Sequence, residues 1–315
     1  MPSPIKTRIL VISDTHGLQF TKQPRLDAID AVIHCGDLTE HSLLSEFHET
    51  IRLLQQIDVP LKLFIPGNHD FTLDDAAFAK IAEASRMPED LLAKAYGAKG
   101  AARKLWDEAA QDGKIVLLDE GEHTLMLANG ATLKVYASPY TPSTERWGFK
   151  YSRKDHDHDF HIGPGIDIAI THGPSRGIMD TAYDSKQIGC PTLFRAVAKA
   201  QPRIHCFGHV HDGWGAKLVA WRSDIPDDAS HLNSIDNDGS LVIETLATLR
   251  DSGEEAVVRK DEYERQGYCD MDHCETKPVL GAGKTLFLNA AMKGKTELDQ
   301  FPWLVEIDLP AVKDA

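Results

Sequence analysis

Five short motifs in this chain combine side chains that can bind metal ions. Their chemistry-bearing residues are aspartate, asparagine and histidine, and they stand at Asp14-x-His16, Gly36-Asp37, Gly67-Asn68-His69-Asp70, Thr171-His172-Gly173 and Gly208-His209-x-His211. Carboxylate and amide oxygens together with imidazole nitrogens suit Mn²⁺, Fe or Zn²⁺. Structural zinc sites typically contain cysteine thiolates, which these motifs lack, so a structural zinc site does not explain them.

Taken singly, the motifs are weak evidence. An Asp-x-His pattern is expected about once by chance in a chain of this length. In an extended segment, moreover, His209 and His211 would point to opposite faces. The positions of the motifs along the chain are more informative than their residues, because each motif directly follows a short apolar run that is typical of a β-strand. The runs cover residues 8–13, 31–35, 61–65, 166–170 and 203–207. Since the carboxyl ends of parallel strands converge on one crevice, the sequence predicts a single site there.

Helical patterns separate these runs, with apolar residues at three- and four-residue spacing. They cover residues 43–57, 76–112 and 191–200. The middle pattern is broken by Pro88, Gly97 and Gly100, which predicts two or three helices. The alternation of strands and helices is typical of parallel βαβ units and predicts an α/β fold. Between residues 114 and 136 the period changes to two around Asn129-Gly130, which predicts a hairpin. Later strands are expected at residues 241–245, 285–288 and 304–307.

Composition excludes several classes of function. The chain has 315 residues, of which 42% are apolar, and its 34 basic and 48 acidic residues give a net charge of −14. Non-specific binding to nucleic acids or anionic membranes depends on basic patches and is not expected. No apolar run approaches the roughly 20 residues that span a bilayer, and no signal peptide is recognisable at the start of the sequence. Five scattered cysteines indicate reduced thiols, so we expect an intracellular, cytoplasmic protein.

Two further segments contain metal-type residues. The run from Asp155 to His161 alternates aspartate and histidine, and either binds metal or forms a solvated loop; we favour the loop. Cys269 and Cys274 flank His273, but their spacing is poor for zinc and no second pair follows. We therefore expect a surface loop there too.

The order and spacing of the five motifs resemble those of calcineurin-like metallophosphoesterases. The sequence around them resembles the metallophosphoesterase-domain-containing (brain-type 239) subgroup, which is similar to class III phosphodiesterases. The segments that carry this second resemblance are Tyr136-Ala137-Ser138-Pro139-Tyr140, Thr171 to Gly177, Gly189-Cys190, His211-Asp212-Gly213-Trp214-Gly215 and Leu288-Asn289-Ala290-Ala291. Typical mammalian members of the subgroup carry glutamate where this chain has Asp70.

The resemblance implies a four-layer αββα sandwich, in which two mixed β-sheets are flanked by helices. It implies a single domain over residues 1–315, with insertions at 84–113 and 250–277. Carried over motif by motif, it assigns Asp14, His16 and His211 to one metal ion. Asn68, His172 and His209 are assigned to a second ion, and Asp37 to both. His69 would be the general acid or a phosphate-binding cation, and Asp70 would orient it.

The implied function is dinuclear-metal-dependent hydrolysis of a small-molecule phosphate ester, by attack of a hydroxide that bridges the two ions. A diester such as a cyclic nucleotide is the favoured substrate. The alternatives are a phosphomonoesterase or Ser/Thr protein phosphatase, and a binding or scaffold protein that keeps the fold without turnover. Which of manganese, iron and zinc occupy the site, and the oligomeric state, stay open.

Overall fold

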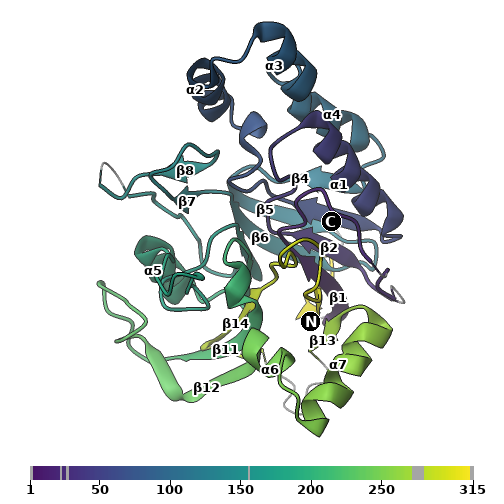
Figure 1. Cartoon of the computed structure of the whole chain (residues 1–315). Helices are drawn as coiled ribbons and strands as arrows, with labels where there is room; N and C mark the ends of the chain where they lie inside the picture. The colour runs from purple at the N-terminus through teal and green to yellow at the C-terminus, as the bar shows by residue number, and fades with distance from the viewer. Residues whose placement is uncertain (1–2, 22, 26–27, 155–156, 272–279, 313–315) are drawn as a thin grey trace.

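Two β-sheets lie face to face at the centre of the molecule, and helices cover their outer faces (Figure 1). The computed structural model describes residues 3–21, 23–25, 28–154, 157–271 and 280–312. Apolar side chains from both sheets meet between them, among them Ile9, Ile33, Ile168 and Leu288, all of which are fully buried. The four-layer α/β sandwich implied by the sequence is confirmed.

The first sheet has six strands in the order β13-β15-β1-β2-β3-β4. Its strands are β1 (Ile5–Ile12), β2 (Ala31–His34), β3 (Leu61–Phe64), β4 (Ile115–Leu117), β13 (Cys269–Asp270) and β15 (Trp303–Leu309). Strands β1 to β4 are parallel, whereas β15 runs antiparallel to β1. Three of the predicted strand ends therefore fall at the same edge of this sheet.

The second sheet has seven strands in the order β12-β11-β14-β10-β9-β6-β5. Its strands are β5 (Gly121–Met126), β6 (Thr132–Ser138), β9 (Ile168–Thr171), β10 (Ile204–Phe207), β11 (Gly215–Trp221), β12 (Ile235–Thr245) and β14 (Lys284–Asn289). Strands β6, β9, β10 and β14 are parallel, and the predicted hairpin is formed by β5 and β6. A separate two-stranded sheet pairs β7 (Thr141–Pro142) with β8 (Lys150–Tyr151).

The helices are α1 (Leu44–Gln56), α2 (Asp75–Ser85), α3 (Glu89–Tyr96), α4 (Ala101–Ala109), α5 (Pro191–Ala200), α6 (Leu246–Leu249) and α7 (Glu254–Gln266), with short 3₁₀ turns at η1 (Phe71–Leu73) and η2 (His211–Gly213). Helices α1 and α4 bury apolar residues against the outer side of the first sheet, and α5 does so against the second. Phe47 of α1 packs over the first sheet, and Phe194 of α5 packs over the second. The pattern of residues 76–112 thus forms three helices.

The two expected insertions both contribute to the folded core. Trp106 of α4 is fully buried, with its ring centroid 4.1 Å from that of Phe64 and 6.3 Å from that of Phe47. In the second segment, α7 buries Tyr263, and β13 pairs with β15 at the edge of the first sheet. Whether these segments are insertions relative to other proteins stays a prediction, but neither is a mere surface excursion.

The aspartate–histidine run is only partly a solvated loop. Residues 155 and 156 lie outside the described residues, as do His273 and Cys274 of the second candidate segment. His161 is exposed, but His158 places its Nε2 atom 2.6 Å from the Glu120 carboxylate and stacks on Tyr140. The described part of this run is therefore anchored to the second sheet. Within the described ranges, no helix has the length and apolar character needed to cross a membrane.

Candidate metal centre

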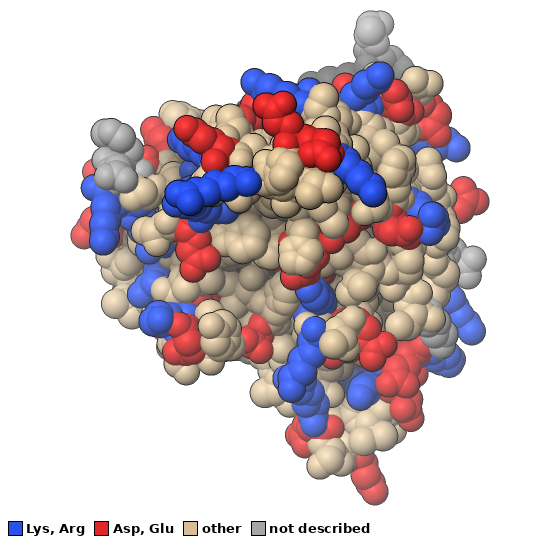
Figure 2. All heavy atoms as spheres, turned by 45° about the horizontal axis from the view of Figure 1, so that its top comes forward, with Lys and Arg blue, Asp and Glu red and all other residues tan. Residues whose placement is uncertain are grey.

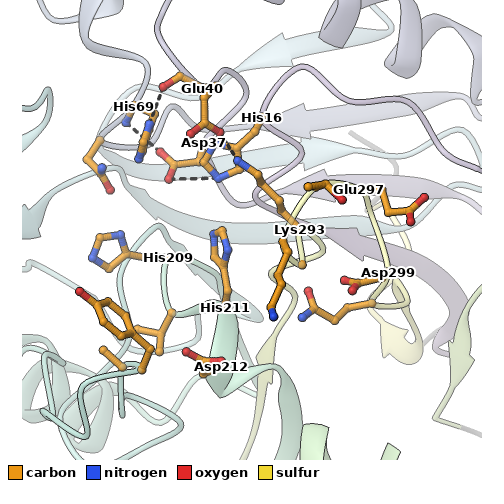
Figure 3. Close-up of a pocket in the computed structure, with 18 of the residues that line it drawn as sticks. His16, Asp37, Glu40, His69, His209, His211, Asp212, Lys293, Glu297 and Asp299 are labelled. Carbon is orange, nitrogen blue, oxygen red and sulfur yellow. Dashed lines mark hydrogen bonds and ion pairs between the residues drawn. The ribbon is translucent and has the colours of Figure 1, made fainter. Parts of the chain in front are cut away.

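All five motifs meet at the edge where the parallel strands of both sheets end. A cavity of about 770 Å³ opens there, lined by side chains of segments that follow strands of both sheets. Figure 3 shows His16, Asp37 and His69 facing this cavity from one side and His209 and His211 from the other. Asp14 and His172 lie deeper and are fully buried. The structure thus brings together side chains that lie as much as 197 residues apart in sequence.

The predicted ligands form two neighbouring groups of donor atoms. Within each group, one donor atom per residue lies within 4.8 Å of the others: Asp14, His16 and His211 form the first group, and Asp37, His172 and His209 the second. The Oδ1 atom of Asn68 lies 3.0 Å from Nε2 of His172, so it adjoins the second group. The resemblance implies the same division, and the assignment of each residue to an ion stays a prediction.

Left-handed backbone conformations occur at four of the predicted metal ligands. The φ angles are +53° at Asp14, +48° at His16, +52° at Asp37 and +66° at His209. Non-glycine residues rarely adopt this region, which costs on the order of 1–3 kcal/mol each and occurs preferentially at functional sites. Hydrogen bonds hold the conformations in place: the amide of Asp14 donates to the carbonyl of Gly36, and that of His16 to the carbonyl of Asp37.

The Gly-His-x-His motif does not continue the strand that precedes it. Strand β10 ends at Phe207, His209 is left-handed, and His211 begins the 3₁₀ turn η2. The side chains of His209 and His211 therefore do not point to opposite faces, as they would in a strand, and both line the same cavity. The ring centroid of His209 lies 5.0 Å from that of His172, and the centroid of His211 lies 5.3 Å from that of His16. The two histidines thus serve different donor groups.

An unsatisfied nitrogen between two carboxylates supports a metal site. His16 is buried, and its Nε2 atom has no hydrogen-bond partner. That atom lies 4.0 Å from Oδ1 of Asp14 and 3.8 Å from Oδ2 of Asp37. A buried polar atom without a partner is costly, and a cation between these three atoms would satisfy them all. Nδ1 of His16 faces the carbonyl of Thr39 at 3.1 Å, which orients the ring. The residues present therefore fit metal ions.

The electrostatics keep the carboxylates ionised, as metal binding requires. Burial alone would raise the pKa of Asp37, but the facing imidazoles, His172 first, lower it well below its ordinary value. Burial would also raise the pKa of Asp14, but the hydrogen bond and charge of His211 lower it below its ordinary value. Burial lowers the pKa of His209 to about 4, so this imidazole is neutral at pH 7 and has a lone pair available to a metal.

Asp70 does not orient His69, contrary to the expectation from sequence. Its buried carboxylate instead accepts hydrogen bonds from the amides of Gly67, Leu38 and Thr39, at 2.7–3.0 Å, and from the Thr39 hydroxyl at 2.7 Å. Burial raises the pKa of Asp70 to about 6, with a further contribution from the charge of Asp37. Asp70 therefore ties the loop that follows β2 to the loop that follows β3.

The His69 ring is positioned by other groups. Its Nδ1 atom lies 2.6 Å from the carbonyl oxygen of Glu40, and its centroid lies 4.2 Å from that of Trp147. Because a carbonyl only accepts, Nδ1 must carry the hydrogen, and Nε2 is left for the cavity. The backbone amide of His69 donates to Oδ1 of Asp37 at 2.9 Å.

Glu40 and Lys293 belong to the site but were missed in the sequence. Glu40 places a carboxylate oxygen 3.1 Å from Nδ1 of His16 and forms an ion pair with Lys293. The hydrogen bond from His16 and the ion pair hold the pKa of Glu40 below its ordinary value. Glu40 could have been found, since it lies three residues after Asp37 in one loop. Lys293 follows β14 and lies outside the five motifs that predicted the ligands, although it comes two residues after the segment Leu288-Asn289-Ala290-Ala291.

The chain is similar to known proteins over the region that contains the five motifs. The model of the calcineurin-like phosphoesterase family matches residues 7–213. The human protein named metallophosphoesterase domain-containing protein 1 is 32% identical over 66% of this chain and 62% of its own length. A UPF0046 protein of Caenorhabditis elegans is 30% identical over 68% of this chain and 54% of its own length. A protein of Emericella nidulans, named "Probable rhamnogalacturonate lyase C", is 30% identical over 68% of this chain but only 18% of its own length.

These relatives are longer than the region they share with this chain, which spans 18–62% of their lengths. Among solved structures, a purple acid phosphatase from yellow lupin seeds aligns with 70% of this chain and 40% of its own, at 14% identity and a TM-score of 0.34. That likeness is too slight to carry an argument. The family match covers well over half of the chain and includes all five motifs. The chain therefore belongs to the calcineurin-like phosphoesterase family.

Proposed function

We propose that this protein hydrolyses phosphate esters at a centre of two transition-metal ions. Asp14, His16 and His211 would hold one ion, Asn68, His172 and His209 the other, and Asp37 both. The position of Asp37 carries the proposal. Its Oδ2 atom lies 3.8 Å from Nε2 of His16 in the first group, and its Oδ1 atom lies 3.3 Å from Nε2 of His172 in the second. A carboxylate between two donor groups is suited to a shared ligand. When bound, two such ions neutralise a phosphate group and supply a nucleophile at neutral pH.

His69 would supply the proton that the leaving oxygen needs. It lines the cavity, and its Nδ1 hydrogen is directed to the Glu40 carbonyl, so Nε2 is the ring atom that would hold the proton for a bound ester. The packing of Trp147 against the ring restricts its orientation. The contacts of His69 with Glu40 and Trp147 therefore hold a proton donor in the wall of the cavity.

Phosphodiesters, such as cyclic nucleotides, are the substrates we propose. Support comes from the subgroup resemblance around the motifs and from the paired histidines of Gly-His-x-His, both of which reach the cavity. Manganese, iron and zinc all suit the donor set. Buried thiols at Cys35, Cys190 and Cys206 favour a reducing compartment, and we propose that the protein acts in the cytoplasm.

The test is elemental analysis of the purified protein followed by an activity assay. We expect about two transition-metal equivalents, and loss of hydrolysis on chelation that is restored by adding metal. Turnover of bis-p-nitrophenyl phosphate should exceed that of p-nitrophenyl phosphate. A preference for the monoester would instead favour a phosphomonoesterase or protein phosphatase. Metal binding without turnover of either ester would favour a scaffold protein.

A further inference from the structure

A second cavity lies next to the metal centre and has no role in the chemistry described so far. Its volume is about 500 Å³, and it lies between α2 and the segment of residues 140–150. The aromatic rings of Tyr140 and Trp147 line it, together with the basic side chains of Lys80, Arg146 and Lys150. Small apolar residues of α2, chiefly alanines, leave the space open on the other side.

Trp147 connects this cavity to the proposed proton donor. Its indole ring lines the cavity, and it also packs on the imidazole of His69, with centroids 4.2 Å apart. The amide of Gly148 donates to the carbonyl of Asn68 at 3.0 Å, which fixes the loop against the metal centre. Trp147, which lines the second cavity, is therefore in direct contact with His69, which lines the first, and contacts with residues of the site set the position of the indole ring.

The charge of the second cavity favours an anion. Within the described part of the chain, Lys80, Arg146 and Lys150 form no ion pair. The acidic residue that lines the cavity, Asp74, already accepts hydrogen bonds from the amides of Ala76, Ala77 and Phe149. The chain as a whole has a charge of −14, and on the face shown in Figure 2 basic and acidic side chains are interspersed. The second cavity therefore brings together three cations that form no ion pair with a described carboxylate.

We infer that this cavity binds the alcohol portion of the substrate, and that this portion carries a planar ring and a second phosphate group. The inference rests on the proposed function, because His69 must face the leaving oxygen for the alcohol to extend past Trp147. A ring stacked on an indole has its centre about 4.5–7 Å away, which the cavity can accommodate. Arginine and lysine bind phosphate through charge-assisted hydrogen bonds. The substrate class is thus a nucleotide-like ester with two phosphate groups.

Calorimetric titration of the metal-loaded, full-length protein tests the second phosphate. The probes are adenosine 5′-monophosphate, which offers one phosphate, and adenosine 3′,5′-bisphosphate, which offers two. We expect the bisphosphate to bind about tenfold more tightly or better, as charge-assisted hydrogen bonds typically provide. In the double variant Arg146→Gln/Lys150→Gln, the two ligands should bind with nearly equal dissociation constants. The matched control Lys94→Gln removes an exposed cation from α3 and should keep the advantage.

The ring is tested separately by comparing adenosine 5′-monophosphate with ribose 5-phosphate. Trp147→Phe should keep the preference for the ligand with a base, whereas Trp147→Leu should abolish it. Equal binding of the monophosphate and bisphosphate by the wild-type protein, or an advantage that survives in the double variant, would overturn the inference alone. Failure of the monophosphate to bind at all would instead count against the metal centre as a phosphate site.

Discussion

The backbone amide of His209 lies 3.0 Å from both oxygens of the Asp14 carboxylate, although 195 residues separate the two. The contact joins the end of β10 in one sheet to the end of β1 in the other. Gly208 makes it possible, because a Cβ atom added there would lie 1.9 Å from Oδ2 of Asp14. The two sheets can therefore meet at the site only where this position has no side chain.

Replacing Gly208 with alanine should disrupt the metal centre. The added methyl group must displace the Asp14 carboxylate, so we expect metal content to fall below that of the wild type and hydrolysis to be lost. Gly281→Ala is the matched control, since an added Cβ there meets nothing within 4 Å. Metal analysis and thermal unfolding of both variants check the prediction, which equal metal content would contradict.

Asp37→Asn should impair both ions together. Because Asp37 faces both donor groups, its loss should lower the content of both metals and reduce turnover by several orders of magnitude. Asp157→Asn, at an exposed position in the aspartate–histidine run, should change neither quantity. If Asp157→Asn lost more metal and more activity than Asp37→Asn, the metals would have to bind elsewhere.

His69→Ala separates proton donation from metal binding. Metal content should be nearly unchanged, while kcat for a cyclic nucleotide should fall by about 10²–10⁴-fold, the usual contribution of a general acid. An aryl diester releases p-nitrophenolate, which needs no proton to leave, so kcat for this substrate should fall much less. Equal losses on both substrates would exclude the proton-donor role, and loss of metal would make His69 a ligand.

Glu120 should contribute to stability in a pH-dependent way. Burial alone would raise its pKa, but hydrogen bonds from His158 and Ser138 lower it below the ordinary value of 4.5. A carboxyl whose pKa is lowered by folding stabilises the protein above its unfolded pKa, and this contribution is lost as the pH falls.

The corresponding experiment compares wild-type protein with Glu120→Gln. The difference in free energy of unfolding should be present above pH 4.5 and should disappear below it, as measured by denaturant titration at several pH values. Glu83→Gln on the exposed side of α2 serves as control and should show no such difference. A difference that is independent of pH would mean that the glutamate acts by packing alone.

Trp106→Ala should show that the segment 84–113 belongs to the core. Truncation of a buried tryptophan typically costs about 3–5 kcal/mol, a large part of the stability of a domain. Leu232, which is 78% exposed, provides a control in Leu232→Ala, which should have little effect. If Trp106→Ala lowered the free energy of unfolding as little as the control does, α4 would contribute nothing to the stability of the protein.

The positions of the strands and of the donor residues could be predicted from the sequence, because buried strands are short apolar runs and their ends are polar. The orientations of the side chains could not be predicted in this way. His209 and His211 share a cavity because His209 is left-handed, and local periodicity does not encode that conformation. Asp70 was given the wrong partner because its hydrogen bonds cross to the loop after β2.

The same limit explains the residues that were missed. Lys293 is separated from Glu40 by 253 residues, and their ion pair exists only because β14 lies within the second sheet. No pattern in the sequence relates the two. Trp147 was overlooked for the same reason, since its contact with His69 depends on the loop between β7 and β8.

The placement of β14 and β15 has a consequence for how the protein is made. Strand β14 lies between β10 and β11, and β15 lies beside β1, so both sheets require strands that follow residue 280. A nascent chain that has passed His211 already contains every proposed metal ligand, yet neither sheet is complete. Ribosome-bound chains, and products of premature termination between residues 211 and 303, should therefore carry the whole set of ligands without forming the centre.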